Sequence, residues 1–282
     1  MNRNVRPYFE HVMGDTFCIV TGYARIPLFK LGGGREELRV AAILTSHAHI
    51  DHTGNHKAIQ QEHGAVVYMT PFDAAVSGTP MNLKAYLYGT SYRGVMDYGA
   101  SMLCRADRII CPEDTAVEVD GARFEILRLP GHAPEHLGFV TPDRVAYVAD
   151  ALMSDRVLNS VRIPYCMCCE LDFQSKRMLR NTNYAGYIIP HNGIYEDITA
   201  LADRNIQKLQ EKIDIVAGLA DHYLSLEELV ARSMTAMGVN GNTIYKIRVA
   251  ERNIQVFVEH LLDTGKLSQR AYRGIIEYVR TE

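Results

Sequence analysis

Four side chains that can bind a metal ion fall within six consecutive residues of this 282-residue chain. They are His47, His49, Asp51 and His52, and they follow the apolar stretch 40–44, which predicts a buried strand. If the backbone stays extended beyond that strand, His47 and His49 share one face and could bind one ion. Asp51 and His52 lie just beyond and could face a second ion. Histidine and carboxylate ligands suit a divalent first-row metal such as zinc.

Three further residues of the same kind stand where predicted strands end. They are His132 after the strand 124–129, Asp150 after 145–149, and His191 after 187–189. With the first cluster they make five histidines and two aspartates, enough to hold two ions and leave an open position on each. Two close cations would lower the pKa of a bound water, polarise a carbonyl or phosphoryl oxygen and stabilise the departing anion. This predicts a hydrolase that uses a metal-bound hydroxide.

The elements that must position these residues mix strands and helices. Further strands are predicted at residues 17–21, 27–30, 65–69, 108–111, 116–119 and 138–140, and helices at 55–62 and 172–180. Helices interspersed among the strands and covering both faces imply a layered α/β or α+β core. The segment 71–106 carries several tyrosines and methionines. We expect it to be either a lid or pocket wall, or ordinary helices packed on a sheet.

From about residue 197 the pattern becomes helical. Apolar residues recur at helical spacing, Ser225 to Glu228 fits a capping box, and Gly265 fits a helix stop. This predicts a separate helical C-terminal subdomain, residues 197–282, whose succession of helices resembles a winged-helix arrangement. Its basic and acidic residues balance from 201 onward, so nucleic acid is not demanded as a partner, although it is not excluded. The expected role of this subdomain is a homodimer contact or an element that closes the pocket, ahead of nucleic-acid binding.

The bulk composition is that of an ordinary globular protein, with 47% hydrophobic and 22% charged residues. A net charge of -3 gives no general attraction to nucleic acid or anionic membrane. There is no membrane-spanning apolar run, and residues 1–7 lack the apolar stretch of a signal peptide. These features predict a cytoplasmic protein whose six cysteines are free thiols. Cys166, Cys168 and Cys169 are interpreted mainly as small apolar packing residues, the alternative being a pocket-lining or redox-sensitive role.

At this point the chain resembles the metallo-β-lactamase-fold hydrolase superfamily over roughly residues 10–195. His47-Ala48-His49-Ile50-Asp51-His52 matches the signature string of that family, and Pro130-Gly131-His132 matches its second histidine motif. Asp150 matches the bridging aspartate, and His191 matches the last histidine. The resemblance implies a four-layer αββα sandwich, with residues 1–196 as the catalytic domain and the site in a groove at the sheet edges.

The resemblance also implies which residue binds which ion. His47, His49 and His132 would hold one metal, Asp51, His52 and His191 the other, and Asp150 would bridge both. Asp51 would orient the bridging hydroxide and accept its proton. Two zinc ions are the default, although iron(II) and manganese fit the same donors. His136 is the one other histidine considered for substrate contact. The family usually carries an aspartate in an early Asp-Thr-Gly turn that supports the ligands from behind, and the corresponding residues 29–32 lack it.

The substrate class is less sharply defined than the chemistry. We expect a small acyl compound, a thioester or lactone, as in glyoxalase II-like members of the family. The basic elements that bind glutathione in glyoxalase II itself are not found. The alternative within the family is a phosphodiesterase or ribonuclease, against which the lack of a broad basic surface argues. A third alternative is a non-catalytic metal-binding or redox protein. The diiron flavoproteins of the family replace the second signature histidine with glutamate, and His49 argues against them.

Overall fold

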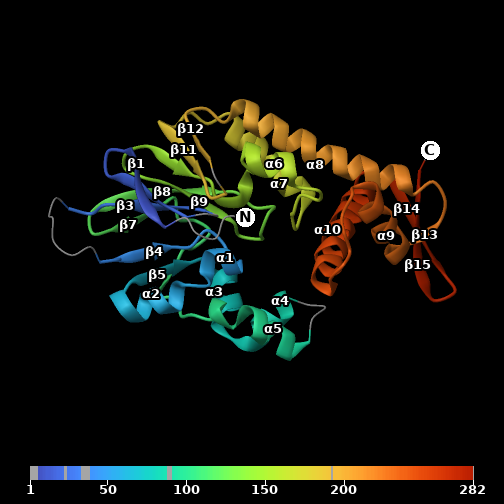
Figure 1. Cartoon of the computed structure of the whole chain (residues 1–282), viewed down its shortest axis with the longest axis horizontal. Coiled ribbons are helices and arrows are strands. Elements are labelled where there is room, and N and C mark those ends of the chain that lie inside the picture. Colours follow the sequence, from blue (N-terminus) through green and yellow to red (C-terminus); the bar gives the residue numbers. More distant parts are fainter. Residues whose placement is uncertain (1–5, 22–23, 33–38, 88–90, 192, 282) are drawn as a thin grey trace. The chain divides into compact units, whose positions relative to one another are not determined.

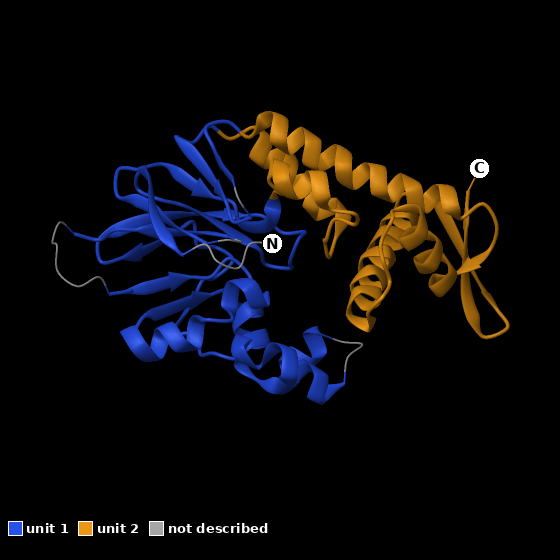
Figure 2. Cartoon of the chain, viewed as in Figure 1, with its two compact units in different colours: residues 1–151, 183–197 blue, residues 152–182, 198–282 orange. Residues whose placement is uncertain are grey.

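The computed structural model describes residues 6–21, 24–32, 39–87, 91–191 and 193–281. The chain divides into two compact units, which Figure 2 colours separately. Unit 1 comprises residues 1–151 and 183–197, and unit 2 comprises residues 152–182 and 198–282. The boundary between residues 196 and 197 stays a prediction. That boundary would place residues 152–182 in the catalytic domain. In the structure, these residues cluster with the C-terminal residues.

Unit 1 contains two small sheets and one large sheet (Figure 1). The first small sheet is antiparallel, with strands β1 (Tyr8–Met13), β2 (Thr16–Val20) and β3 (Arg25–Phe29). The second is parallel, with strands β4 (Ala42–Leu44), β5 (Val66–Met69) and β6 (Arg108–Ile109). The helices between its strands are α1 (Ile50–Thr53), α2 (His56–His63), α3 (Pro71–Gly78), α4 (Pro80–Tyr86) and α5 (Tyr92–Gly99), followed by the short 3-10 helix η1 (Ala100–Met102). The parallel pairing follows from these crossover helices, since parallel strands need a long connection.

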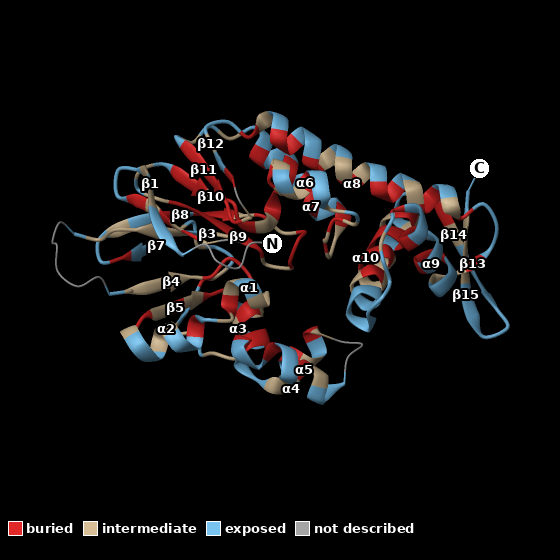
Figure 3. Ribbon diagram, in the orientation of Figure 1, coloured by how far each residue is buried: buried red, intermediate tan, exposed pale blue. Residues whose placement is uncertain are grey.

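The large sheet has six strands in the order β12-β11-β10-β9-β8-β7. They are β7 (Ala116–Val119), β8 (Ala122–Arg128), β9 (Leu137–Val140), β10 (Val145–Tyr147), β11 (Gly186–Ile189) and β12 (Gly193–Tyr195). Strands β9 and β11 are buried along their whole length, as the red colour in Figure 3 shows. Phe124, Ile126 and Phe139 pack with Phe29 and Leu44, so the large sheet faces the small sheets across one apolar core.

Unit 2 is built around helices α6 (Asp155–Ser160), α7 (Cys169–Arg180), α8 (Thr199–Leu219), α9 (Leu226–Ala236) and α10 (Ile244–Asp263). A small sheet has the order β13-β15-β14, from strands β13 (Leu224–Ser225), β14 (Leu267–Tyr272) and β15 (Ile275–Arg280). Its later elements follow the order of a winged helix: α8, the short strand β13, α9, α10 and the closing hairpin of β14 and β15. The apolar core of this unit includes Phe173, Ile213, Leu229 and Phe257.

Several expectations from the sequence can be compared with these elements. The capping box at Ser225 and Glu228 is present, and Gly265 ends α10 with a positive φ of 69°. Cys166 and Cys169 are buried in the core of unit 2, with their sulfurs 3.7 Å apart. The helices expected in the C-terminal region are present, and β14 and β15 add a hairpin to them. Among the described residues, no helix combines the length and apolar character needed to cross a membrane.

Candidate metal centre

The loop between β4 and α1 carries the first four candidate ligands. His49 has an extended backbone, with φ −96° and ψ 155°, and is the residue that precedes the first turn of α1. The amide nitrogens of His52 and Thr53 and the hydroxyl of Thr53 all donate to the carbonyl oxygen of His49. This closes the turn and places Asp51 and His52 in the first turn of α1. The extended backbone expected from the sequence therefore persists to His49 and stops there.

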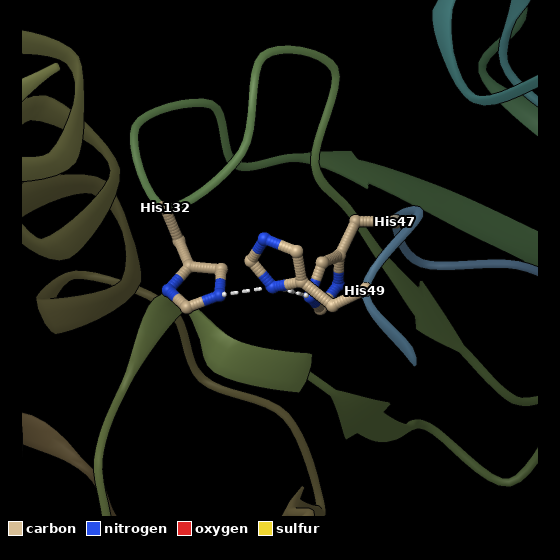
Figure 4. A group of neighbouring side chains, drawn as sticks. All are labelled: His47, His49 and His132. Carbon is tan, nitrogen blue, oxygen red and sulfur yellow. Dashed lines mark hydrogen bonds between the residues drawn. The ribbon is translucent and has the colours of Figure 1, made fainter. Parts of the chain in front are cut away.

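The first group consists of His47, His49 and His132, which Figure 4 shows converging. His49 Nδ1 lies 2.9 Å from His47 Nε2 and 3.1 Å from His132 Nε2. His132 comes from the turn after β8, where Gly131 has a φ of 130° that favours glycine. Residues 83 positions apart thus meet at one point of unit 1.

The second group consists of Asp51, His52, Asp150 and His191. Asp51 Oδ2 lies 3.5 Å from His191 Nε2 and 3.8 Å from His52 Nε2. Asp150 Oδ1 lies 3.7 Å from His191 Nε2, and its Oδ2 lies 3.5 Å from both His52 Nε2 and His132 Nε2. Since His132 belongs to the first group, the Asp150 carboxylate is the point at which the two groups meet.

Two histidines of the first group, His47 and His49, are held neutral. Burial, followed by the neighbouring histidines, keeps the pKa of His47 well below its ordinary value. Burial and the nearby His132 lower the pKa of His49 to about 3. A neutral imidazole keeps a nitrogen lone pair, which is the form that binds a metal.

The second group has the opposite electrostatic character. Hydrogen bonds to Asp150 and Asp51 raise the pKa of His191 to about 10. Burial alone would lower the pKa of His52, but the Asp150 and Asp51 carboxylates outweigh it and raise that pKa. Burial works against ionisation of Asp150, yet His52 and His191 hold its pKa well below the ordinary value. Both carboxylates are therefore ionised near neutral pH, and a cation would compete with protons for the two histidines.

A family model for the metallo-beta-lactamase superfamily matches residues 25–219, which is more than two thirds of the chain and includes all seven of these residues. The chain belongs to the metallo-beta-lactamase superfamily. Hydroxyacylglutathione hydrolase GloC of Haemophilus influenzae is 29% identical over 128 residues, which are 41% of this chain and 51% of that protein. A hydroxyacylglutathione hydrolase of Chromohalobacter salexigens is 28% identical over 122 residues, or 43% of this chain and 36% of that one. The chain thus spans about half or less of the length of these relatives.

Solved structures support the same fold. A metallo-beta-lactamase family protein from Thermus thermophilus has a TM-score of 0.65 at 20% identity, covering 86% of this chain and 80% of the other. A beta-lactamase domain protein from Burkholderia ambifaria has a TM-score of 0.60 at 16% identity, covering 86% and 75%. At these identities the likeness concerns the fold, and it confirms the mixed α/β class predicted from the sequence.

The donor sets of this superfamily member fit divalent cations. Two nitrogens bound tetrahedrally to one zinc ion lie about 3.3 Å apart, given zinc–nitrogen bonds of about 2.0–2.1 Å. The separations of 2.9 and 3.1 Å in the first group are close to that spacing. Within each group, the possible ligand atoms all lie within 4.8 Å of one another. Three imidazoles on one side and two anionic carboxylates on the other are donors that zinc, iron(II) and manganese share.

Two buried residues, neither of them expected in this role from the sequence, hold the loop and turns in place. The amide of Ala48, between His47 and His49, donates to Asp73 Oδ1 at 3.0 Å. The amide of Asp150 donates to His136 Nε2 at 3.2 Å. The pattern Thr70-Pro71-Phe72-Asp73 signals a helix start, and Thr70 does cap α3, but the reach of Asp73 to Ala48 has no local signal. His136 is completely buried, so the expected substrate contact is wrong.

Strain in the backbone also contributes to the placement of Asp150. Ala149, directly before it, has a φ of 45° and is fully buried. Non-glycine residues rarely adopt this left-handed conformation, and it costs about 1–3 kcal/mol where it occurs. Ala149 and Asp150 belong to the 3-10 helix η2 (Ala149–Ala151), which follows β10. The turn at this strand end therefore aims the carboxylate at the two histidine groups at some expense of stability.

Proposed function

We propose that this protein is a hydrolase that holds two divalent cations, with zinc as the favoured metal, at the two ligand groups. The observation that carries the proposal is the position of Asp150 Oδ2, 3.5 Å from both His132 Nε2 and His52 Nε2. One carboxylate within reach of both groups is what a shared ligand of two close cations requires. When bound, the cations would lower the pKa of a water molecule and polarise the oxygen of the scissile group.

In this proposal Asp51 orients the attacking water and accepts its proton. Its side chain is 52% exposed, so water reaches it from solvent. Burial works against ionisation, but hydrogen bonding to His191 and the charge on His52 lower the pKa of the carboxyl. Asp51 is therefore ionised at neutral pH and has an oxygen 3.5 Å from His191 Nε2. Without a cation, His191 has a raised pKa and holds a proton near the same oxygen, which a bound cation would displace.

We propose a small acyl compound, a thioester or a lactone, as the substrate. The two relatives named hydroxyacylglutathione hydrolase support an acyl substrate. An aromatic pair beside the first group supports an apolar acyl chain: the rings of Tyr86 and His49 are 6.3 Å apart, and those of Tyr86 and Phe72 are 5.7 Å apart. Phe72 and Tyr86 belong to α3 and α4. These helices of the segment 71–106 are thus placed to form an apolar wall.

The test is a hydrolysis panel of thioesters, lactones, phosphodiesters and RNA on protein of measured metal content. We expect acyl compounds to be cleaved, and chelation to abolish turnover until zinc is restored. Asp51→Asn should lower turnover by about 10²–10⁴-fold, the usual contribution of a positioned acid or base. Asp97→Asn is the matched control, because the Asp97 side chain is 72% exposed and pairs with Arg93 on α5. Normal turnover in Asp51→Asn would remove Asp51 from its role, and fewer than one metal per reconstituted chain would reject the binuclear centre.

A second candidate, a phosphodiesterase that cuts RNA, is favoured by the helix and strand order of unit 2. Winged helices place a recognition helix against nucleic acid, and the corresponding helix is α10. Its first turns expose Tyr245 and Lys246, although Arg248 is engaged with Glu251 at 2.7 Å. Cleavage of RNA alone in the same panel would reverse the order of the two candidates.

A further inference from the structure

One buried hydroxyl lies between histidines of the two ligand groups. Ser46 Oγ is 3.2 Å from His47 Nδ1 and 3.3 Å from His52 Nδ1. Ser46 is only 3% exposed, and the rings of the two histidines have their centroids 4.1 Å apart. His47 belongs to the first group and His52 to the second. The same oxygen therefore touches both.

In both rings Nδ1 faces Ser46, and Nε2 faces the ligand groups. His47 Nε2 lies 2.9 Å from His49 Nδ1, and His52 Nε2 lies 3.5 Å from Asp150 Oδ2. A ring nitrogen that binds a metal must offer a lone pair, so a neutral ring bound through Nε2 carries its proton on Nδ1. In that tautomer His47 and His52 each direct an Nδ1–H at Ser46 Oγ.

The hydrogen-bonding capacity of Ser46 matches this arrangement. A serine hydroxyl has two lone pairs and one proton. The two lone pairs accept from His47 and His52, and the proton is directed to Tyr147, whose hydroxyl forms a hydrogen bond with the Ser46 side chain. The backbone is fixed as well, because Leu137 N donates to the Ser46 carbonyl oxygen at 2.8 Å. The proton and both lone pairs of the Ser46 hydroxyl thus each have a partner, and these contacts hold the side chain in place.

We propose that Ser46 is a positioning residue that fixes the Nδ1-protonated tautomer of both His47 and His52 and so couples the two metal sites through one oxygen. The inference rests on the proposed metal centre. Its consequence is specific: a change at Ser46 alters the affinity for both ions together, although Ser46 itself binds neither.

The test compares zinc binding by Ser46→Ala and Ser46→Thr, measured as stoichiometry and affinity in competition with a chelator. Loss of an outer partner of metal-bound histidines typically weakens metal affinity about 10–100-fold. We expect that loss at both sites in Ser46→Ala and near-normal binding in Ser46→Thr, which keeps the hydroxyl. Thr45→Val is the matched control, because Thr45 Oγ1 is buried and has no hydrogen-bond partner among the described residues. It should bind zinc like the wild type.

Nitrogen NMR of the histidine rings provides a second readout. It would not change if Ser46 only supported the fold. The zinc-loaded wild type should show slowly exchanging Nδ1–H signals from both His47 and His52, and Ser46→Ala should lose or shift both. If Ser46→Ala does not fold, Tyr147→Phe replaces it. That variant frees the Ser46 proton to turn towards an imidazole, and it should weaken both zinc affinities in parallel.

The outcomes separate this inference from the proposed function. A wild type that binds two zinc ions while Ser46→Ala binds both unchanged overturns the role of Ser46 and leaves the metal centre standing. Weakening at one site alone overturns the coupling, as does an equal effect of Thr45→Val. A wild type that binds no zinc overturns the metal centre itself and the inference with it.

Discussion

Asp73 should make the stability of this protein fall as the pH rises. It is only 1% exposed, and burial raises the pKa of its carboxyl to about 7. Hydrogen bonds from Thr70 and Ala48 oppose that rise, while the nearby Glu135 adds to it. The ordinary pKa of the group is 3.8, which applies to the unfolded chain. Between these two values the folded protein keeps a proton that the unfolded chain has released.

The sign and size of the effect follow from that difference. The free energy of unfolding falls by about 1.4 kcal/mol per pH unit where the folded state holds one more proton. From about pH 4 to pH 7 the contribution of Asp73 therefore declines by about 4 kcal/mol, and above pH 7 it stays constant. Asp73→Asn cannot titrate but keeps an oxygen that can accept from Ala48 N. Its stability relative to the wild type should thus rise by about 4 kcal/mol across this window.

The assay is urea unfolding of wild type, Asp73→Asn and Asp97→Asn from pH 4.5 to 8, with chelator present so that metal binding does not contribute. Other titrating groups cancel in the difference between variants. Asp73→Ala adds a separate loss of about 1–3 kcal/mol at every pH, because the buried amide of Ala48 is left without its acceptor. Parallel pH profiles for wild type and Asp73→Asn would refute the reasoning.

Three further predictions concern other buried or charged groups. His136→Leu should destabilise the fold by about 1–3 kcal/mol, because Asp150 N loses its hydrogen-bond acceptor. His136→Gln keeps an acceptor oxygen and should destabilise it less, and thermal unfolding measures both variants. Asn205→Ala should lower the free energy of unfolding by about 2–4 kcal/mol, because the Asn205 side chain accepts from Met153 N and donates to Met153 O in unit 2. Urea unfolding measures this loss, with an Asn→Ala change at an exposed position as the control. Zinc binding at pH 7.5 should release about one proton from His191, seen by calorimetry in two buffers and absent in His191→Ala.

The composition of the candidate centre could be predicted because each residue carries a local signal. His47, His49 and Asp51 lie in one string after a strand, and Asp150 and His191 each follow a strand end. Strand ends gather at the edge of a sheet, so their polar residues meet without any knowledge of the packing. The spacing within the string separated His47 and His49 from Asp51 and His52, whereas the family resemblance assigned His132, His191 and Asp150 to the two groups.

The supporting residues could not be predicted, since their partners are distant in the sequence and are backbone amides. Asp73 reaches Ala48 across 25 positions, and no side-chain pattern marks an amide as needing an acceptor. The sequence suggested a winged-helix-like arrangement, but the strands of its hairpin could not be placed, for another reason. Strand β14 is buried only at Leu267 and mostly exposed beyond it, so it lacks the alternation that identifies a half-buried strand. The short helices α3, α4 and α5 begin at the capping residues Thr70, Thr79 and Ser91, which are local signals of a helix start.

The missing early aspartate and the buried Asp73 are connected. The family usually supports the signature loop from behind with an aspartate, and residues 29–32 contain none. Here Asp73 Oδ1 accepts from Ala48 N in the middle of that loop, and it comes from α3 after the following strand, β5. An acceptor oxygen is needed there because the Ala48 amide is buried between two neutral histidines, and a buried amide requires a hydrogen-bond partner. We therefore expect Asp73→Ala to lower zinc affinity at the first group more than at the second, whereas Ser46→Ala should lower both.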